Sequence, residues 1–541
     1  MARNEREKKK VATLLNRYST LTNQRRVWES HWQEIADYMV PRKADITRQR
    51  TDGAKRTEKI FDGTAIHSAE LLTASLHGML TSASMPWFSL RFTDPALDGD
   101  DMAKEWLEGA ERVMYDALAR SNFQEQVHEL YADLVAFGTA VMFIDGDDKT
   151  QLRFSTRHIA ECYLAEDEHG RVDTVMRRYK MSGRDARSMW GKNIGPSLMS
   201  KVAENPYDMI EFLHVIQPRD NYDVGMSDNL NMPWMSCHID PENKYLIAES
   251  GFEEFPYVCP RFLKASFEQG YGRSPAMTAL PDTKMLQEMS KTTIKSAQKQ
   301  VDPPLLVPDD GFVLPVRVTP GGLNFYRSGT RDRIEPLMTG ANTPLGLNIE
   351  NQRREAIRQA FFVDQLMLRE SPNMTATEVI ARNEEKMRLL GPVLGRLQAE
   401  MLQPLITRAF NLLAKQKIFA PAPEYLQTGN IDIEYVSPLA KAQRQGELDS
   451  TLRMFEILSP LAQVDPGVFD YIDMDGLVKF VTKTVGVPAT VMRGEGEVLQ
   501  IRKERAEAQA EQAELDQANQ VAEAAGAAAP ALKAIGGMSQ Q

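Results

Sequence analysis

The sequence has few cysteines and no long apolar run. Its three cysteines are Cys162, Cys237 and Cys259, too few and too scattered for a disulfide framework or a four-thiolate zinc site. The most apolar stretch, residues 71–90, contains a histidine, a glycine and six Ser or Thr residues, so it is not typical of a membrane span. The charged first ten residues are followed by no apolar core of a signal peptide. We therefore expect a soluble, unprocessed chain from a reducing cytosol, with no membrane partner.

The sequence also lacks an excess of basic residues. Its 64 Lys and Arg side chains stand against 75 Asp and Glu, which gives a formal net charge of −11. This balance excludes a protein that coats nucleic acid through a general basic field, although it leaves room for local basic patches. With 42% hydrophobic and 26% charged residues, the composition is that of a globular protein. Its 541 residues suggest about three to four domains.

Catalytic motifs are missing from the sequence. Ala186 and Asn193 stand where a phosphate loop ending in Gly191-Lys192 needs a glycine and a Ser or Thr. His128 has no second histidine four residues later, so the helical zinc pair is absent. No G-x-S-x-G nucleophile motif is present. We therefore predict no enzyme activity and no cofactor.

Two weaker patterns also favour structural roles. Residues 473–476 resemble the start of a calcium loop, but the later ligands are missing, so we predict a helix cap or a turn and no metal. Cys237 and His238 are neighbours in a segment that is typical of a strand. Side chains of adjacent strand residues point to opposite faces, which argues against a catalytic pair.

The N-terminal half is predicted to be helical and then rich in strands. Apolar spacing predicts a helix over residues 5–40, and the polar residues 42–58, six of them basic, predict a mobile surface loop. Further helices are expected near 65–83 and 101–120. Residues 134–145 indicate a buried helix end that turns into a strand and hairpin. Short β-rich runs separated by turn clusters predict a mixed sheet over 150–265.

The C-terminal half is predicted to be mainly helical. A helix over 282–300 ends at Asp302-Pro303-Pro304, a Pro- and Gly-rich β-like module follows over 301–345, and residues 348–366 are helical again. From Thr375 a long helix runs toward Lys415, with kinks expected at Gly391-Pro392 and Pro404. Helical patterns continue over 440–485 and over the Ala/Glu/Gln-rich residues 497–523, and residues 524–541 are expected to be flexible.

The helix over 282–300 carries a stripe of four lysines. Lys284, Lys291, Lys295 and Lys299 are separated by 7, 4 and 4 residues. At about 100° per residue they fall within an arc of roughly 80°, with Leu286, Met289, Thr293 and Ala297 on the opposite side. The stripe fits a solvated helix face, and it also fits a surface that meets phosphates without reading bases.

The second helix of the pair carries charges of both signs. Its candidates for a subunit interface are Arg353, Arg354, Arg358, Glu350 and Glu355. The mixture suits ion pairs between neighbouring subunits as well as it suits DNA. It equally suits pairing between residues four apart on one helix surface.

A series of short motifs runs along the chain from about residue 60 to 440. They are Ile60-Phe61-Asp62-Gly63-Thr64-Ala65, Met85-Pro86-Trp87-Phe88, Phe137-Gly138-Thr139-Ala140, Tyr271-Gly272-Arg273-Ser274-Pro275, Asp302-Pro303-Pro304, Met374-Thr375-Ala376-Thr377-Glu378-Val379 and Tyr435-Val436-Ser437-Pro438-Leu439-Ala440. Together they resemble the portal proteins, or head-to-tail connectors, of short-tailed (podovirus-type) double-stranded DNA bacteriophages. Each motif alone is weak, but their order and coverage indicate the family.

The resemblance implies a function in the virion. It implies a homo-oligomeric ring, a dodecamer, at one capsid vertex, whose channel serves packaging and ejection of double-stranded DNA. Its implied partners are the terminase, a tail adaptor, and the major capsid and scaffolding proteins, all met after synthesis in the host bacterial cytoplasm. An alternative is another structural virion component, a tail adaptor or an internal core protein without a DNA-translocating channel. An enzyme carried in the particle is a third possibility, which lacks convergent ligands in the sequence.

The resemblance also implies a fold, which is α+β and predominantly helical. Its parts are a wing (1–278, helices then a mixed β region), stem helix 1 (279–300), a clip (301–345), stem helix 2 (346–367), a tunnel loop (368–374), a long kinked wing helix with its return (375–440), a crown (441–496), a C-terminal barrel helix (497–523) and a flexible tail (524–541). The implied tunnel-loop residues are Leu368, Arg369, Glu370, Ser371, Pro372 and Asn373. Because DNA must slide, we expect an acidic channel wall with sparse basic rings, and we predict that the lysine stripe faces the channel.

Overall fold

The computed structural model describes residues 2–48, 50–51, 53–84, 86–92, 100–223, 225–226, 228–306, 323, 325, 334–336, 343–366, 391–423, 451, 453–458, 460, 472–485, 497–510 and 512. The chain divides into two compact units, Met1–Ser89 with Arg112–Ile418 and Leu90–Glu111 with Phe419–Gln541. The first contains the sheets and most of the described helices, and the second is described through separate helical segments.

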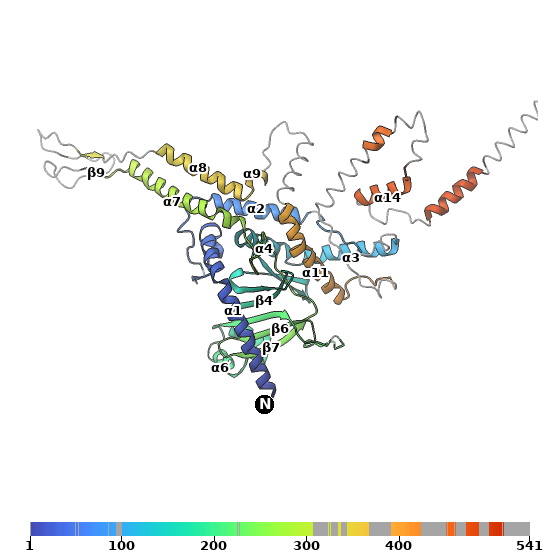
Figure 1. The fold of residues 1–541 in the computed structure, drawn as a ribbon, viewed down its shortest axis with the longest axis horizontal. Coiled ribbons are helices and arrows are strands. Elements are labelled where there is room, and N and C mark those ends of the chain that lie inside the picture. The colour runs from blue at the N-terminus through green and yellow to red at the C-terminus, as the bar shows by residue number, and fades with distance from the viewer. Residues whose placement is uncertain are drawn as a thin grey trace, which may run out of the picture. The chain divides into compact units, whose positions relative to one another are not determined.

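The first unit begins with a long amphipathic helix, α1 (Ala2–Met39), which confirms the helix expected over 5–40. Figure 1 shows α1 lying along the five-stranded sheet. Val11, Leu14 and Leu21 pack there against Leu213 and Cys237 of the sheet. The C-terminal half of α1 is deeply buried, and the indole N–H of its Trp32 donates to the carbonyl of Phe137 at 3.1 Å.

The sheet that α1 covers has five strands in sequential order. They are β3 (Cys162–Glu166), β4 (Val172–Ser182), β5 (Met209–Pro218), β6 (Trp234–Asp240) and β7 (Tyr245–Phe252). The prediction of a sheet in this region is confirmed, but the prediction of mixed strand directions is wrong. Every pair is antiparallel, because each strand connects to its spatial neighbour through a turn or short excursion.

The connection from β4 to β5 contains two short helices that the sequence did not reveal. They are α5 (Gly183–Trp190) and α6 (Pro196–Glu204). Ala186, Leu198 and Val202 of this connection pack with Tyr179 and Phe212 of the sheet. Both sheet faces are therefore covered in part, one by α1 and the other by α5 and α6.

A second, three-stranded sheet is built around the end of α4. α4 (Phe123–Phe137) leads into β1 (Val141–Asp147) and β2 (Gln151–Arg157), as predicted, and β8 (Tyr257–Val258) completes the sheet in the order β2-β1-β8. α2 (Thr64–Leu80) packs against α4. Leu72, Leu76 and Leu134 are fully buried in this part of the core.

Two helices then form an antiparallel pair, α7 (Pro275–Val301) and α8 (Thr343–Ala360), followed by α9 (Val363–Leu366). α7 begins earlier than the predicted residue 282. Its first turns bury Ala276 and Leu280, and the Ser274 hydroxyl accepts the Met277 N–H at 3.0 Å as a cap. The free energy gained from this packing and from the cap exceeds the cost of the helical hydrogen bond that Pro281, which has no N–H, cannot make. Beyond α7, β9 (Leu305–Leu306) pairs with β10 (Glu335–Pro336).

The described part of the long helix, residues 391–415, has a π turn just before Pro404, where a kink was predicted. A π turn spans Gln398–Leu402, and α11 (Gln403–Lys415) follows. The Gln403 N–H donates to the Gln398 carbonyl, and the wider turn precedes a proline that has no N–H to donate. Leu394, Leu397, Met401 and Leu405, spaced three and four residues apart, are buried along this helix.

The second unit contains part of α3 (Asp101–Arg120), whose bounds agree with the predicted helix, together with α14 (Met474–Val485) and a helix over 497–510. Asp473 caps α14, since its Oδ1 accepts the N–H groups of Asp475 and Gly476 at 3.1 Å. The predicted cap at this motif is thus confirmed. Among the helices that the structure describes, none is long and apolar enough to span a membrane.

Candidate functional site

The pair of helices α7 and α8 carries the candidate residues that the sequence singled out. The helices lie side by side and lead away toward β9 (Figure 1). Arg353 Nη1 donates to Asp282 Oδ1 at 2.8 Å, and Thr293 Oγ1 donates to Glu350 Oε1 at 2.5 Å. Arg353 follows Glu350 in α8, but its partner Asp282 precedes Thr293 in α7. The two helices are therefore antiparallel.

The four lysines lie on the side of α7 away from its buried residues. Lys295 and Lys299 are exposed, and the described residues offer neither of them an ion pair. Lys284 pairs with Glu34 at 3.0 Å while remaining about half exposed. Lys291 lies 3.7 Å from Glu288 and over the ring of Phe61. The lysine stripe therefore faces solvent. Its two lysines without an ion pair among the described residues are those at the end of the helix near β9.

The opposite face of α7 differs in detail from the predicted one. Leu286 and Ser290 are buried and Met289 and Thr293 are partly buried, but Ala297 is exposed. Ala297 was expected on the packed face with the other three, and that expectation was wrong: it is exposed together with Ile294 and Gln298 in the last turns of α7.

Three of the five candidates on α8 are engaged within the chain. Glu350 is almost fully buried and accepts hydrogen bonds from Thr293 and from Arg354, four residues away. Arg354 also donates to Asp62 Oδ2 at 2.9 Å, and Arg353 pairs with Asp282. Arg358 and Glu355 stay about half exposed and 4.0 Å apart.

The Ile60–Ala65 motif is held by this helix pair. The Gln287 side-chain carbonyl accepts the N–H groups of Phe61 and Asp62, and its amide donates to the Asp62 carbonyl at 2.7 Å. Burial opposes ionisation of Asp62, but hydrogen bonds from Thr64 and Arg354 outweigh it and lower its pKa. The motif therefore joins α2 to the base of α7 and α8.

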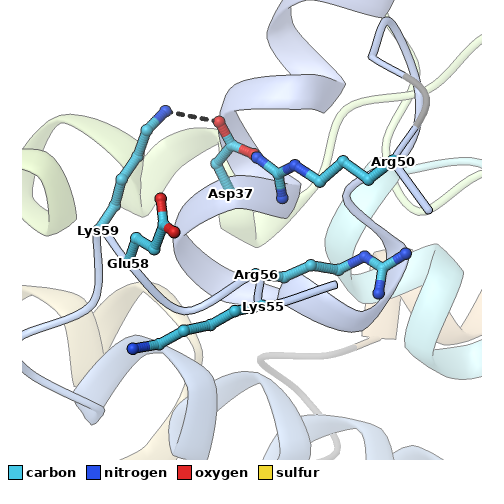
Figure 2. A pocket seen from close by; sticks show the side chains of 6 residues that line it. All are labelled: Asp37, Arg50, Lys55, Arg56, Glu58 and Lys59. Carbon is cyan, nitrogen blue, oxygen red and sulfur yellow. Dashed lines mark hydrogen bonds and ion pairs between the residues drawn. The ribbon is translucent and has the colours of Figure 1, made fainter. Parts of the chain in front are cut away.

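The charged loop before this motif is fixed by ion pairs rather than free. Figure 2 shows Lys59 and Arg50 on either side of Asp37, whose carboxylate accepts from Lys59 Nζ at 2.6 Å and lies 3.7 Å from Arg50 Nη2. Arg56 pairs with Asp45 at 2.5 Å. The cavity that they line measures about 20 Å³, room for one water and not for a larger ligand.

Cys237 and His238 point to opposite sheet faces, as predicted. Cys237 is buried against α1, whereas the His238 ring stacks on His214 with centroids 4.0 Å apart. Burial and the nearby Arg177 charge lower the pKa of His238 to about 4. Burial raises the pKa of the Cys237 thiol to about 12. Neither group has the charge state or exposure of a catalytic residue near neutral pH.

Several predicted parts lie beyond what the structure describes. These are the tunnel-loop residues 368–373, the first part of the long wing helix, all but a few residues of the clip, the segment 424–450 and the tail after residue 512. In the described ranges, no group of three or more His, Cys, Asp or Glu side chains is placed to hold a metal ion.

Comparison with known proteins places these features in a family. The family model described as "Bacteriophage head to tail connecting protein" matches residues 11–492. The chain is 33% identical to the portal protein of Salmonella phage epsilon15, over 94% of this chain and 93% of that protein. It is 31% identical to the probable portal protein of Bordetella phage BPP-1, over 92% and 91%. The chain belongs to the bacteriophage head-to-tail connecting proteins.

A more distant relative is also a portal protein. The portal protein of Enterobacteria phage T3 is 20% identical over 83% of both chains. This head-to-tail connecting protein is therefore a phage portal, a structural connector and not an enzyme. The tail-adaptor and core-protein alternatives receive no support, because the full-length relatives are portal proteins. As a portal, the chain is a component of the virion.

Proposed function

We propose that this portal protein assembles as a ring at one capsid vertex and that double-stranded DNA passes through its channel during packaging and ejection. The observation that carries the proposal is the antiparallel pair α7 and α8, with an exposed lysine face on α7 and the strand pair β9–β10 beyond it. A helix pair that leaves the body and returns can line a channel when copies are arranged around an axis.

The proposed parts follow the order of the chain. Residues 279–300 and 346–367 form the stem, 301–345 the clip, and 1–278 with 375–440 the wing. The tunnel loop is residues 368–374, the crown is 441–496, and 497–523 form a helical barrel ahead of the tail. The helix observed over 497–510 exposes nearly all of its residues. Such a helix buries little by itself, which suits a bundle of copies around the ring axis.

The lysine stripe is proposed to face the channel. Lys295 and Lys299 are exposed cations on a chain of net charge −11. Isolated rings of positive charge on an acidic wall attract phosphates without the large counterion release that would hold DNA in place. Lys284 and Lys291 extend the stripe toward the base of the helix, where Glu34 and Glu288 weaken their field.

The remaining contacts are proposed on the same basis. We place the terminase and later the tail adaptor at the clip end, and the capsid shell and scaffold around the wing. Arg358 and Glu355 are the α8 candidates that remain exposed for a neighbouring subunit. Arg353, Arg354 and Glu350 instead act within the chain and would support such an interface by fixing α8 on α7.

The test of the channel proposal is a pair of double variants. K295A/K299A should form rings of normal mass but package or retain less DNA than the wild type. The control K149A/K192A removes two exposed lysines from the β1–β2 turn and the α5–α6 connection and should behave as the wild type does. Unchanged packaging and retention in K295A/K299A would overturn the channel assignment.

A further inference from the structure

The loop between β5 and β6 spans residues 219–233 on the first unit, and 219–223, 225–226 and 228–233 of it are described; we call it the knob. It is closed at its base, where the Arg219 N–H donates to the Pro233 carbonyl at 2.8 Å. Asp223 Oδ1 accepts the Gly225 N–H, Asp228 Oδ1 accepts the Leu230 N–H, and the Asn231 amide bonds Asp228 at 2.8 Å. These bonds hold the described residues of the knob in one conformation without a hydrophobic core.

The knob presents apolar and acidic side chains to solvent. Tyr222, Met226 and Leu230 are 44–56% exposed. Asp220, Asp223 and Asp228 are exposed as well, and no basic side chain among the described residues pairs with them. The knob's one basic residue, Arg219, turns back to Glu249 and the Ser250 carbonyl. The surface therefore suits a partner that brings cations and some apolar contact.

The charged loop at residues 42–59 has the opposite character. It contains seven basic and three acidic residues. Lys43 is anchored to Asp133 at 2.5 Å and Lys59 to Asp37, so the loop too is fixed in place. Arg48 and Lys55 remain exposed without an ion pair among the described residues.

The two surfaces lie at separate places on the same unit. The β4–β5 connection with α6 is at one end of the antiparallel sheet, so the knob after β5 leaves from the other end. The charged loop instead lies against α4 and the C-terminal part of α1, through the pairs of Lys43 with Asp133 and of Lys59 with Asp37. In a closed ring each neighbour contact joins two different surfaces of identical chains.

We infer that the knob 219–233 of one copy docks on the charged loop 42–59 of the next copy around the ring. The partner is thus a second copy of this chain, selected by the complementary charge that the chain itself carries. This inference rests on the proposed ring and assigns two surfaces that form its subunit contact. Pre-formed loops on both sides lose little conformational entropy on docking.

The experiment uses two charge-altered full-length variants. D220K/D223N/D228N changes the knob from three negative charges to one positive, and the two Asn residues keep the hydrogen-bond acceptors of its turns. R48E/K55E reverses the exposed cations of the charged loop. The control D148K/E168K changes the net charge as much as the knob variant does, at two exposed β-turn positions. The readout is the assembled mass against protein concentration, with circular dichroism to confirm folding.

Each altered variant alone should need at least about tenfold more protein to assemble, whereas the control should match the wild type. An equimolar mixture of the two variants should recover assembly, because each knob then meets a loop of opposite charge on the other variant. Normal assembly of both single variants, or no recovery by the folded mixture, would overturn the inference while the ring proposal stands. A wild-type chain that forms no ring under any of these conditions would overturn both.

Discussion

Gly138 and Gly272 touch through their main chains. A Cβ atom on Gly272 would lie 2.6 Å from the carbonyl oxygen of Gly138 and 2.7 Å from that of Leu263. Gly138 itself ends α4 in the left-handed conformation, with φ of 74°. The Gly272 N–H donates to Thr139 Oγ1 at 2.8 Å, so the two motifs that contain these glycines join α4 to the start of α7.

Substitution of Gly272 by alanine should destabilise the first unit. The added methyl group has no space between two carbonyl oxygens, so the backbones must separate, at a cost of about 1–3 kcal/mol or more. Thermal unfolding of G272A should shift down accordingly. G78A is the matched control, because a Cβ at Gly78 in α2 meets nothing within 4 Å and alanine favours a helix. Equal melting temperatures for the two variants would contradict this packing.

A buried ion cluster makes a second prediction. Arg261, 2% exposed, donates to Glu400 through its main-chain N–H at 3.0 Å and through Nη2 at 2.8 Å, and it also pairs with Glu166. R261M removes the buried cation that both carboxylates share and leaves Glu166 with Lys264 and Glu400 with Arg396, so it should cost about 3 kcal/mol. Chemical denaturation provides the measurement.

The control for R261M is the exposed pair of Lys415 and Glu253, 2.8 Å apart. K415M should change the unfolding free energy by less than about 1 kcal/mol, because solvent screens this pair. If R261M lowered the unfolding free energy no more than K415M does, the contact of Arg261 with Glu400 would not be what anchors the π turn.

The stacked histidines predict acid sensitivity. His238 is held neutral with a pKa near 4, and burial together with the His238, Arg177 and Arg157 charges lowers the pKa of His214 well below its usual value. In the unfolded chain both histidines bind a proton near pH 6.5, whereas in the folded chain they stay neutral. Protonation therefore favours the unfolded chain, and the unfolding free energy falls as the pH drops from 6.5 toward 4. His238 alone accounts for about 3 kcal/mol of this loss.

The measurement is the unfolding free energy between pH 7.5 and 4. H238F should flatten its decline, because one proton uptake on unfolding is removed while a ring stays against Trp190. H169Q, which alters an exposed histidine, should leave the slope unchanged. A slope in H238F equal to that of the wild type would show that other groups cause the acid sensitivity.

Periodicity predicted the long helices well. The bounds of α1, α2 and α3 agree with expectation to within a few residues, because each buries an apolar stripe that is continuous in sequence. At Pro404 a kink was predicted, and the structure has a π turn just before it. The start of α7 was missed, because its first turns depend on long-range packing of Ala276 and Leu280.

Contacts between distant residues could not be predicted from one sequence. Nothing near Arg261 indicates that Glu400, 139 residues later, lies beside it. The directions of the strands likewise depend on connections that the β-rich pattern leaves open. The lysine stripe was visible from spacing alone, whereas the use of Glu350, Arg353 and Arg354 within the chain depends on where Asp62 and Asp282 lie.

The central claim is that copies of this chain enclose a channel for double-stranded DNA. Negative-stain imaging of the purified protein, with its assembled mass measured alongside, tests this most directly. The account predicts a closed ring with a central opening wide enough for a duplex. A chain that remains a monomer even in the presence of scaffold and shell protein would contradict it.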